Sequence, residues 1–270
     1  MSSRHCHLLA FSAAVLLTPV ATLADFTWVG YDNTQDIILG LRKAGSPDLI
    51  FDLGSYNTFN SARTIDGSLV TGLYGSNLDG VSWSVSGAIG DPNSTDWKTL
   101  FMTDPATVNG LPANKAWQNK SSGILGQTTS KIGTLGGNLN TAVSLSLQSA
   151  TLVANNALTI TPNGASLDKS YTYAMTKNGT GNYGGTFQGK FEGTLPTGFS
   201  TGATHQQMDF YEVQPTDTTG KAGASTLLGT FDFAPDGALT FTPAPEPSVC
   251  ALAGLALLGL ARRRWFGQRA

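Results

Sequence analysis

Short segments whose pattern of apolar and polar residues indicates a strand recur along most of the chain. The clearest is residues 80–88, where three apolar side chains and three serines take alternate positions: Val81, Trp83 and Val85, and Ser82, Ser84 and Ser86. This pattern predicts a strand with one face buried and the other in water. Comparable strand signals lie at 26–31, 36–41, 48–53, 98–103, 143–147, 157–161, 171–173, 185–191, 208–213, 226–233 and 238–242. Asp236-Gly237 predicts a hairpin turn between the last two.

About a dozen strands at this spacing predict an all-β fold, an antiparallel sandwich or a jelly roll. Residues 111–154 are less regular: a short helix fits near 113–119, and Gly136-Gly137 interrupts any longer one. No repeat, charge run or linker divides this body, so we expect one domain over residues 25–242, flanked by an N-terminal signal helix and a short C-terminal transmembrane helix.

The first 24 residues have the three parts of a secretory signal peptide. Arg4 begins a short basic region, the apolar run Leu8–Leu17 follows, and Thr22-Leu23-Ala24 supplies small residues ahead of Asp25. We expect signal peptidase to cut between Ala24 and Asp25. The alternative is a buried N-terminal helix, which the abrupt change to strand-like composition after Ala24 disfavours.

The C-terminal residues also have three ordered parts. Pro245-Glu246-Pro247 comes first, the apolar run 249–261 second, and a basic cluster third: Arg262, Arg263 and Arg264. Thirteen helical residues extend about 20 Å, short of a bilayer core of about 30 Å, so the run is a marginal membrane span. The arginines would hold its C-terminal end in the cytoplasm.

These three parts resemble the PEP-CTERM sorting signal of exported proteins of Gram-negative bacteria, usually ones that make exopolysaccharide. In that family a membrane-embedded exosortase recognises the tail and processes it near the Pro-Glu-Pro motif. The resemblance covers about residues 243–270. It implies an inner-membrane intermediate, followed by release or attachment to the cell surface or extracellular matrix. It brings no catalytic residue into the body.

Removing both ends simplifies the chemistry that the body offers. Residues 25–244 hold 11 basic and 17 acidic side chains, a net charge of −6 that disfavours nucleic acid as a partner. Cys6 and Cys250 both lie in the removed ends, so the body has no thiol. His205 is its only histidine. The sequence therefore predicts no metal centre of the common His-rich or thiolate kinds, and no cofactor.

Two enzyme hypotheses remain open. Gly198–Gly202 has the spacing of a nucleophile elbow, with Ser200 as nucleophile, His205 as base and Asp209 as the orienting carboxylate. The elbow requires a buried strand before the serine and a helix after it, and Leu195-Pro196-Thr197 supplies no such strand. A glycosidase needs two carboxylates about the scissile bond, and Glu192 and Glu212 are the only glutamates of the body. We expect no enzymatic activity.

Exposed aromatic rings offer a route to carbohydrate binding, because they stack on the apolar faces of sugars. Trp97, Trp117, Tyr56, Tyr74 and Tyr183 lie among polar turn residues, and we select Trp117 and Tyr183 as candidates. The alternative is that these rings belong to the core, as we expect for Trp28 and Trp83.

Two further motifs favour turns over ligand sites. Oxygen-bearing side chains at 91–96 resemble a calcium loop, but the glycine and glutamate of such a loop are missing, and an Asp-Pro turn is the simpler reading. Gly179–Gly184 has dinucleotide-loop spacing, but a strand pattern follows it where a helix is required.

The sequence thus predicts an exported surface or matrix protein with a structural or adhesive role beside exopolysaccharide. A carbohydrate-binding module and a weak hydrolase are the alternatives.

Overall fold

All strands in the described part of the chain belong to one antiparallel sheet. A computed structural model describes residues 36–89, 99–105, 128–129, 132–133, 135–137, 150–153, 157–161, 170–176, 191–215 and 222–245. The strands are β1 (Asp36–Arg42), β2 (Asp48–Ser55), β3 (Arg63–Ile65), β4 (Ser82–Ala88), β5 (Leu100–Asp104), β6 (Ala150–Val153), β7 (Ala157–Ile160), β8 (Gly193–Thr194), β9 (Gln206–Pro215), β10 (Ala222–Phe233) and β11 (Leu239–Pro243).

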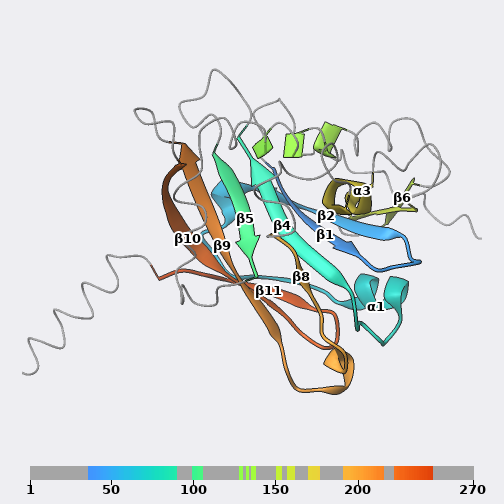
Figure 1. Cartoon of the computed structure of the whole chain (residues 1–270). Helices are drawn as coiled ribbons and strands as arrows, with labels where there is room; N and C mark the ends of the chain where they lie inside the picture. Colours follow the sequence, from blue (N-terminus) through green and yellow to red (C-terminus); the bar gives the residue numbers. More distant parts are fainter. Residues whose placement is uncertain are drawn as a thin grey trace, which may run out of the picture.

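The sheet order is β3-β11-β10-β9-β5-β4-β1-β2-β7-β6, and β8 pairs with β4 at the N-terminal end of that strand. Figure 1 shows that the sheet is strongly curled. The predicted antiparallel β fold is confirmed. The described strands form a single curled sheet, however, in place of the two facing sheets of a sandwich.

Aromatic side chains fill the inner face of the curled sheet. The rings of Phe210 and Phe231 lie 5.3 Å apart, those of Phe231 and Phe241 4.8 Å apart, and Phe59 joins them at 5.2 Å from Phe241. Trp83 is completely buried in the same cluster, as predicted. Helix α1 (Ser68–Tyr74) and the short 3-10 helices η1 (Tyr56–Thr58) and η3 (Phe199–Thr201) add residues to this core.

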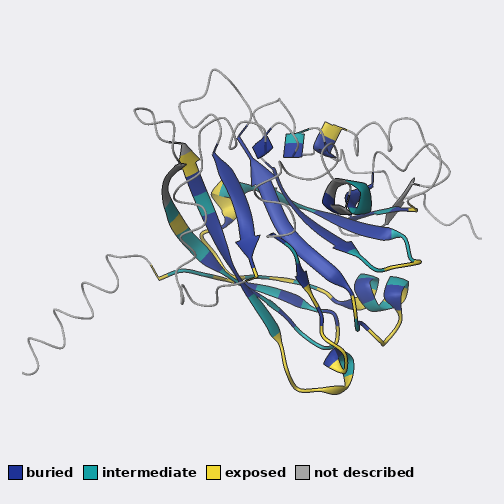
Figure 2. Cartoon of the chain, viewed as in Figure 1, coloured by how far each residue is buried: buried dark blue, intermediate teal, exposed yellow. Residues whose placement is uncertain are grey.

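The outer face of the central strands is buried as well, which the sequence did not predict. Ser82, Ser84 and Ser86 on β4 are at most 6% exposed, so the strand is covered on both faces (Figure 2). Helix α3 (Tyr171–Thr176) lies over this face (Figure 1). The Tyr171 and Ser84 hydroxyl oxygens are 2.6 Å apart, a hydrogen bond that satisfies both groups away from water.

The strand predicted at 171–173 was wrong, because these residues begin α3. The Tyr173 amide donates to Ser170 Oγ at 3.1 Å, a side-chain cap that starts a helix where the alternating Tyr-Thr-Tyr pattern suggested a strand. Tyr171 also fits closely against β1. A Cβ built on Gly40 would lie 2.3 Å from the Tyr171 ring, so the ring occupies the space that a side chain would fill.

The predicted strands near β1, β2, β4, β5, β7, β9, β10 and β11 are confirmed. The turn at Asp236-Gly237 is also confirmed, with Gly237 at φ 87° and the Ala234 amide donating to Ala238 O. The predicted strands at 26–31 and 143–147, the predicted strand at 185–191 except for its last residue, and the helix near 113–119 lie outside the described residues. So do the signal peptide at 1–24 and the tail beyond Pro245. Within the described ranges, no helix has the length and apolar character needed to cross a membrane.

We predict that Gly40→Ala lowers the free energy of unfolding by about 1–3 kcal/mol, because the added methyl must displace the Tyr171 ring. Gly72→Ala is the matched control: Gly72 lies within α1 with nothing within 4 Å of its built Cβ, so alanine should stabilise the helix by about 0.5–1 kcal/mol. Urea denaturation of both variants measures the difference. Equal changes in the free energy of unfolding for the two variants would contradict the close packing of Tyr171 against Gly40.

Candidate functional site

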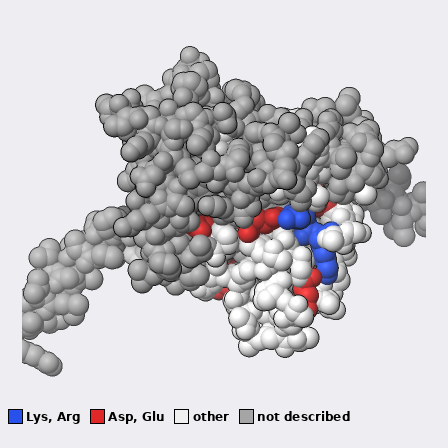
Figure 3. Space-filling model, in the orientation of Figure 1, with Lys and Arg blue, Asp and Glu red and all other residues white. Residues whose placement is uncertain are grey.

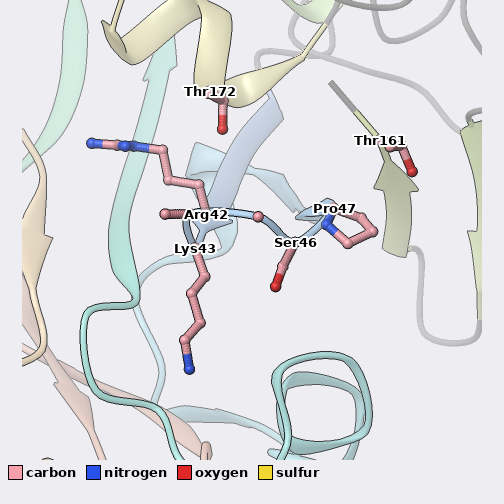
Figure 4. Close-up of a pocket in the computed structure, with 8 residues that line it drawn as sticks. Arg42, Lys43, Ser46, Pro47, Thr161 and Thr172 are labelled. Carbon is pink, nitrogen blue, oxygen red and sulfur yellow. The ribbon is translucent and has the colours of Figure 1, made fainter. Parts of the chain in front are cut away.

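A pocket of about 460 Å³ lies at the turn between β1 and β2. The turn residues Arg42–Pro47 form most of its wall, and Thr161 after β7 and Thr172 of α3 complete it (Figure 4). The turn is tight: Gly45 has φ 77° and the Ser46 amide donates to Lys43 O at 3.1 Å. Three segments distant in sequence therefore meet around one opening.

Arg42 is held on one side of this opening by Glu192, which precedes β8. Arg42 Nε and Nη2 donate to the two Glu192 carboxylate oxygens at 2.7 and 2.6 Å, a bidentate pair. The hydrogen bonds to Glu192 raise the pKa of Arg42, although its burial acts in the opposite direction. Because Glu192 is committed to this pair, it serves as the counter-ion of Arg42 in this structure.

Asp48 lies beneath the α3 wall of the pocket and is fully buried. The Thr172 amide donates to Asp48 Oδ2 at 2.7 Å, and the Thr172 hydroxyl donates to Asp48 Oδ1. Burial raises the pKa of Asp48 to about 6, while the Thr172 hydrogen bonds and the nearby charge of Arg42 act to lower it. Asp48 thus both fixes Thr172 in the pocket wall and titrates just below neutral pH.

Hydrogen-bonding groups of several kinds line the opening. Lys43 Nζ donates to Asn77 O, which ties the turn to the segment after α1. In Figure 4 the Thr172 hydroxyl points from α3 toward the turn, and Ser46 carries a second hydroxyl on the turn itself. Pro47 and Ala44 add apolar surface. In Figure 3, the basic surface on this face is small and lies beside acidic surface.

The three residues of the hydrolase hypothesis hydrogen-bond to residues outside the proposed triad. Ser200 Oγ accepts the Leu78 amide at 2.7 Å, and His205 Nδ1 lies 2.9 Å from Asp232 Oδ1. Asp209 is buried and accepts the Thr230 hydroxyl at 2.8 Å. Among the described residues, no hydrogen bond joins Ser200 to His205. In this geometry Ser200 fastens the loop before β9 to the segment before β4.

The aromatic candidates divide into two groups. Trp117 and Tyr183 lie outside the described residues, as do Trp97, the acidic segment 91–96 and the glycine-rich loop 179–184. Tyr56 stacks on Phe101 with ring centroids 4.7 Å apart. Tyr74 is only 8% exposed, and its hydroxyl donates to Leu41 O and Pro47 O. The reading of Tyr74 as an exposed sugar-stacking ring was therefore wrong, because α1 turns it into the core.

The pocket was not predicted from the sequence. The only local signal of the pocket is Gly45-Ser46-Pro47 between two strand patterns, which indicates a turn but not which other segments lie beside it.

Several residues predicted to direct sorting and cleavage lie outside the described residues: Glu246, Pro247, Arg262, Arg263 and Arg264 of the tail, and the cleavage pair Ala24 and Asp25. Pro245 is described and exposed. Comparison with protein families, with curated proteins and with solved structures finds no match to this chain.

We predict that Asp48 makes the protein more stable in mild acid than at neutral pH. Its pKa is higher in the folded state than the ordinary 3.8, so the folded state binds the proton more tightly. The contribution of Asp48 to the free energy of unfolding is therefore fully present below about pH 4, and it is lost as the pH rises through about 6. Since one unit of pKa is worth about 1.4 kcal/mol, the decline is at most about 3 kcal/mol.

The measurement is the free energy of unfolding of wild type minus that of Asp48→Asn, followed from pH 4 to pH 8. Thr172→Val is the companion variant: it removes a hydrogen bond that lowers the pKa of Asp48, so the decline should move to higher pH. A difference that stays flat, or that grows with pH, would contradict the assigned cause.

Proposed function

We propose that this chain is an exported, exosortase-sorted protein of the cell surface or extracellular matrix. Its role is structural or adhesive, in association with exopolysaccharide, and it has no enzymatic activity of its own. Signal peptidase removes residues 1–24, and the C-terminal run 249–261 holds an inner-membrane intermediate until exosortase processes the tail. The signal helix and the short transmembrane helix flank the β body and are absent from the mature protein.

The ordered three-part tail carries this proposal. Pro245-Glu246-Pro247, the apolar run and Arg262–Arg264 follow one another at the C-terminus, as in the PEP-CTERM signal. The fold is compatible with a cut at that motif. The last strand, β11, ends at Pro243, and the Ala244 amide donates to Leu228 O at 2.8 Å. The hydrogen-bonded sheet thus extends up to the residue before Pro245, and removal of the tail would leave it whole.

The core and the composition of the body also support a structural role. Its core is a continuous aromatic and aliphatic cluster on one sheet, and the sequence of the body contains no cysteine. Such a body gains its stability from burial of apolar surface and requires no oxidising step during export. The described members of the hydrolase hypothesis, Ser200, His205 and Asp209, serve structural contacts, which favours a non-enzymatic role.

We predict two processing events, which intact mass spectrometry of protein recovered from the culture medium and from washed cells would measure. The recovered chain should begin near Asp25 and end near residues 243–247. Glu246→Gln, which changes the centre of the motif, should raise the fraction of chains that keep the tail. Glu212→Gln is the matched control and should leave processing unchanged.

A wild-type mass that retains Arg262–Ala270 would mean that the tail is a plain membrane anchor, and the exosortase proposal would be wrong. Efficient surface delivery of a chain truncated after Pro245 would also contradict it.

A further inference from the structure

We propose that the pocket at the β1–β2 turn binds an uncharged, hydroxyl-rich ligand, a neutral sugar unit of a polysaccharide. The inference deepens the proposed function and rests on it for the polysaccharide context. The pocket itself rests on the geometry of residues 42–47, 161 and 172. Its volume of about 460 Å³ falls within the range of roughly 300–1,000 Å³ that is usual for small-molecule sites.

The charges around the pocket balance, which argues against an anionic ligand. Arg42 and Lys43 bring two positive charges, and Glu192 and Asp48 bring two negative charges at neutral pH. Arg42 is already neutralised by its bidentate contact with Glu192. The net charge of −6 over residues 25–244 would in addition repel a polyanion. A neutral ligand needs no unpaired cation and is not repelled by the net negative charge.

The available hydrogen-bonding groups suit sugar hydroxyls. Ser46 Oγ lines the pocket and makes no hydrogen bond in the described part of the chain. An ammonium group has three N–H donors, and Lys43 uses one on Asn77 O. A guanidinium has five, of which Glu192 accepts two from Arg42. Each sugar hydroxyl both donates and accepts, so it can pair with donors of this kind and with Ser46.

The wall of the pocket is fixed before a ligand arrives, which lowers the ordering cost of binding. Thr172 is held by its two hydrogen bonds to Asp48. The Pro47 carbonyl accepts the Tyr74 hydroxyl at 3.1 Å, which anchors the turn to α1. Pro47 and Ala44 offer apolar surface against which the C–H groups of a sugar ring can pack.

The test uses the mature protein and matrix polysaccharide from the cells that make it, divided by anion exchange into a neutral and an acidic fraction. Fluorescence or calorimetric titration measures the affinity for each. We expect binding to the neutral fraction. Ser46→Ala should weaken it about threefold to tenfold through loss of one hydrogen bond, and Lys43→Met should weaken it to a similar extent.

Ser61→Ala is the matched control, because Ser61 is exposed on the connection before β3 and does not line the pocket. Thermal unfolding of each variant separates a binding defect from a folding defect. Preference for the acidic fraction would overturn the neutral-ligand proposal. Neutral binding that Ser46→Ala and Lys43→Met leave unchanged would place the ligand elsewhere, and absence of binding to both fractions would overturn the pocket proposal. The proposed function is tested separately by the intact mass of the recovered chain, so its failure is distinguishable from failure of the pocket proposal.

Discussion

The packing of the Tyr171 ring against Gly40 is the contact that positions helix α3 on the outer face of the sheet. A helix of six residues such as α3 is too short to be stable alone, so its position must come from tertiary contacts. Tyr171 supplies them: its ring fills the space above Gly40, and its hydroxyl bonds Ser84 on the next strand. Once Tyr171 is fixed, the next residue, Thr172, stands over Asp48. The α3 wall of the pocket follows from that placement.

The two acidic groups near the pocket have different hydrogen-bond partners. Glu192 faces the guanidinium of Arg42 directly, with both oxygens occupied by charged donors. Asp48 receives only the neutral donors of Thr172, and Arg42 acts on it without a hydrogen bond to its carboxylate. Burial therefore outweighs stabilisation of the charged form at Asp48, and its pKa rises to about 6.

Strands whose pattern is local could be predicted, whereas features that need a distant partner could not. Local residue patterns located β1, β2, β4 and the last three strands, because an alternating segment such as β4 or a short apolar run before a turn is contained in adjacent residues. The serines of β4 were predicted to face solvent because the residues that cover them are distant in sequence: Ser84 bonds Tyr171, 87 residues away, and Ser82 bonds Thr194, 112 residues away. Proximity in sequence was equally misleading for Ser200, His205 and Asp209, because they hydrogen-bond to other residues than one another: Ser200 to Leu78, and His205 and Asp209 to two residues of β10. The pocket needed positions 42–47, 161 and 172 together, which no short window contains.

The sheet order separates the pocket from the point where the tail leaves the body. The tail follows β11, whose neighbours are β10 and β3, and the pocket lies at the turn between β1 and β2. Four strands, β10, β9, β5 and β4, stand between β11 and β1 in the sheet. A ligand at the β1–β2 turn and a processing enzyme at Pro245 would therefore engage different parts of one rigid sheet. Under the proposed function, sorting at one part and attachment at the other need no conformational coupling, and the pocket has the same walls before and after the tail is removed.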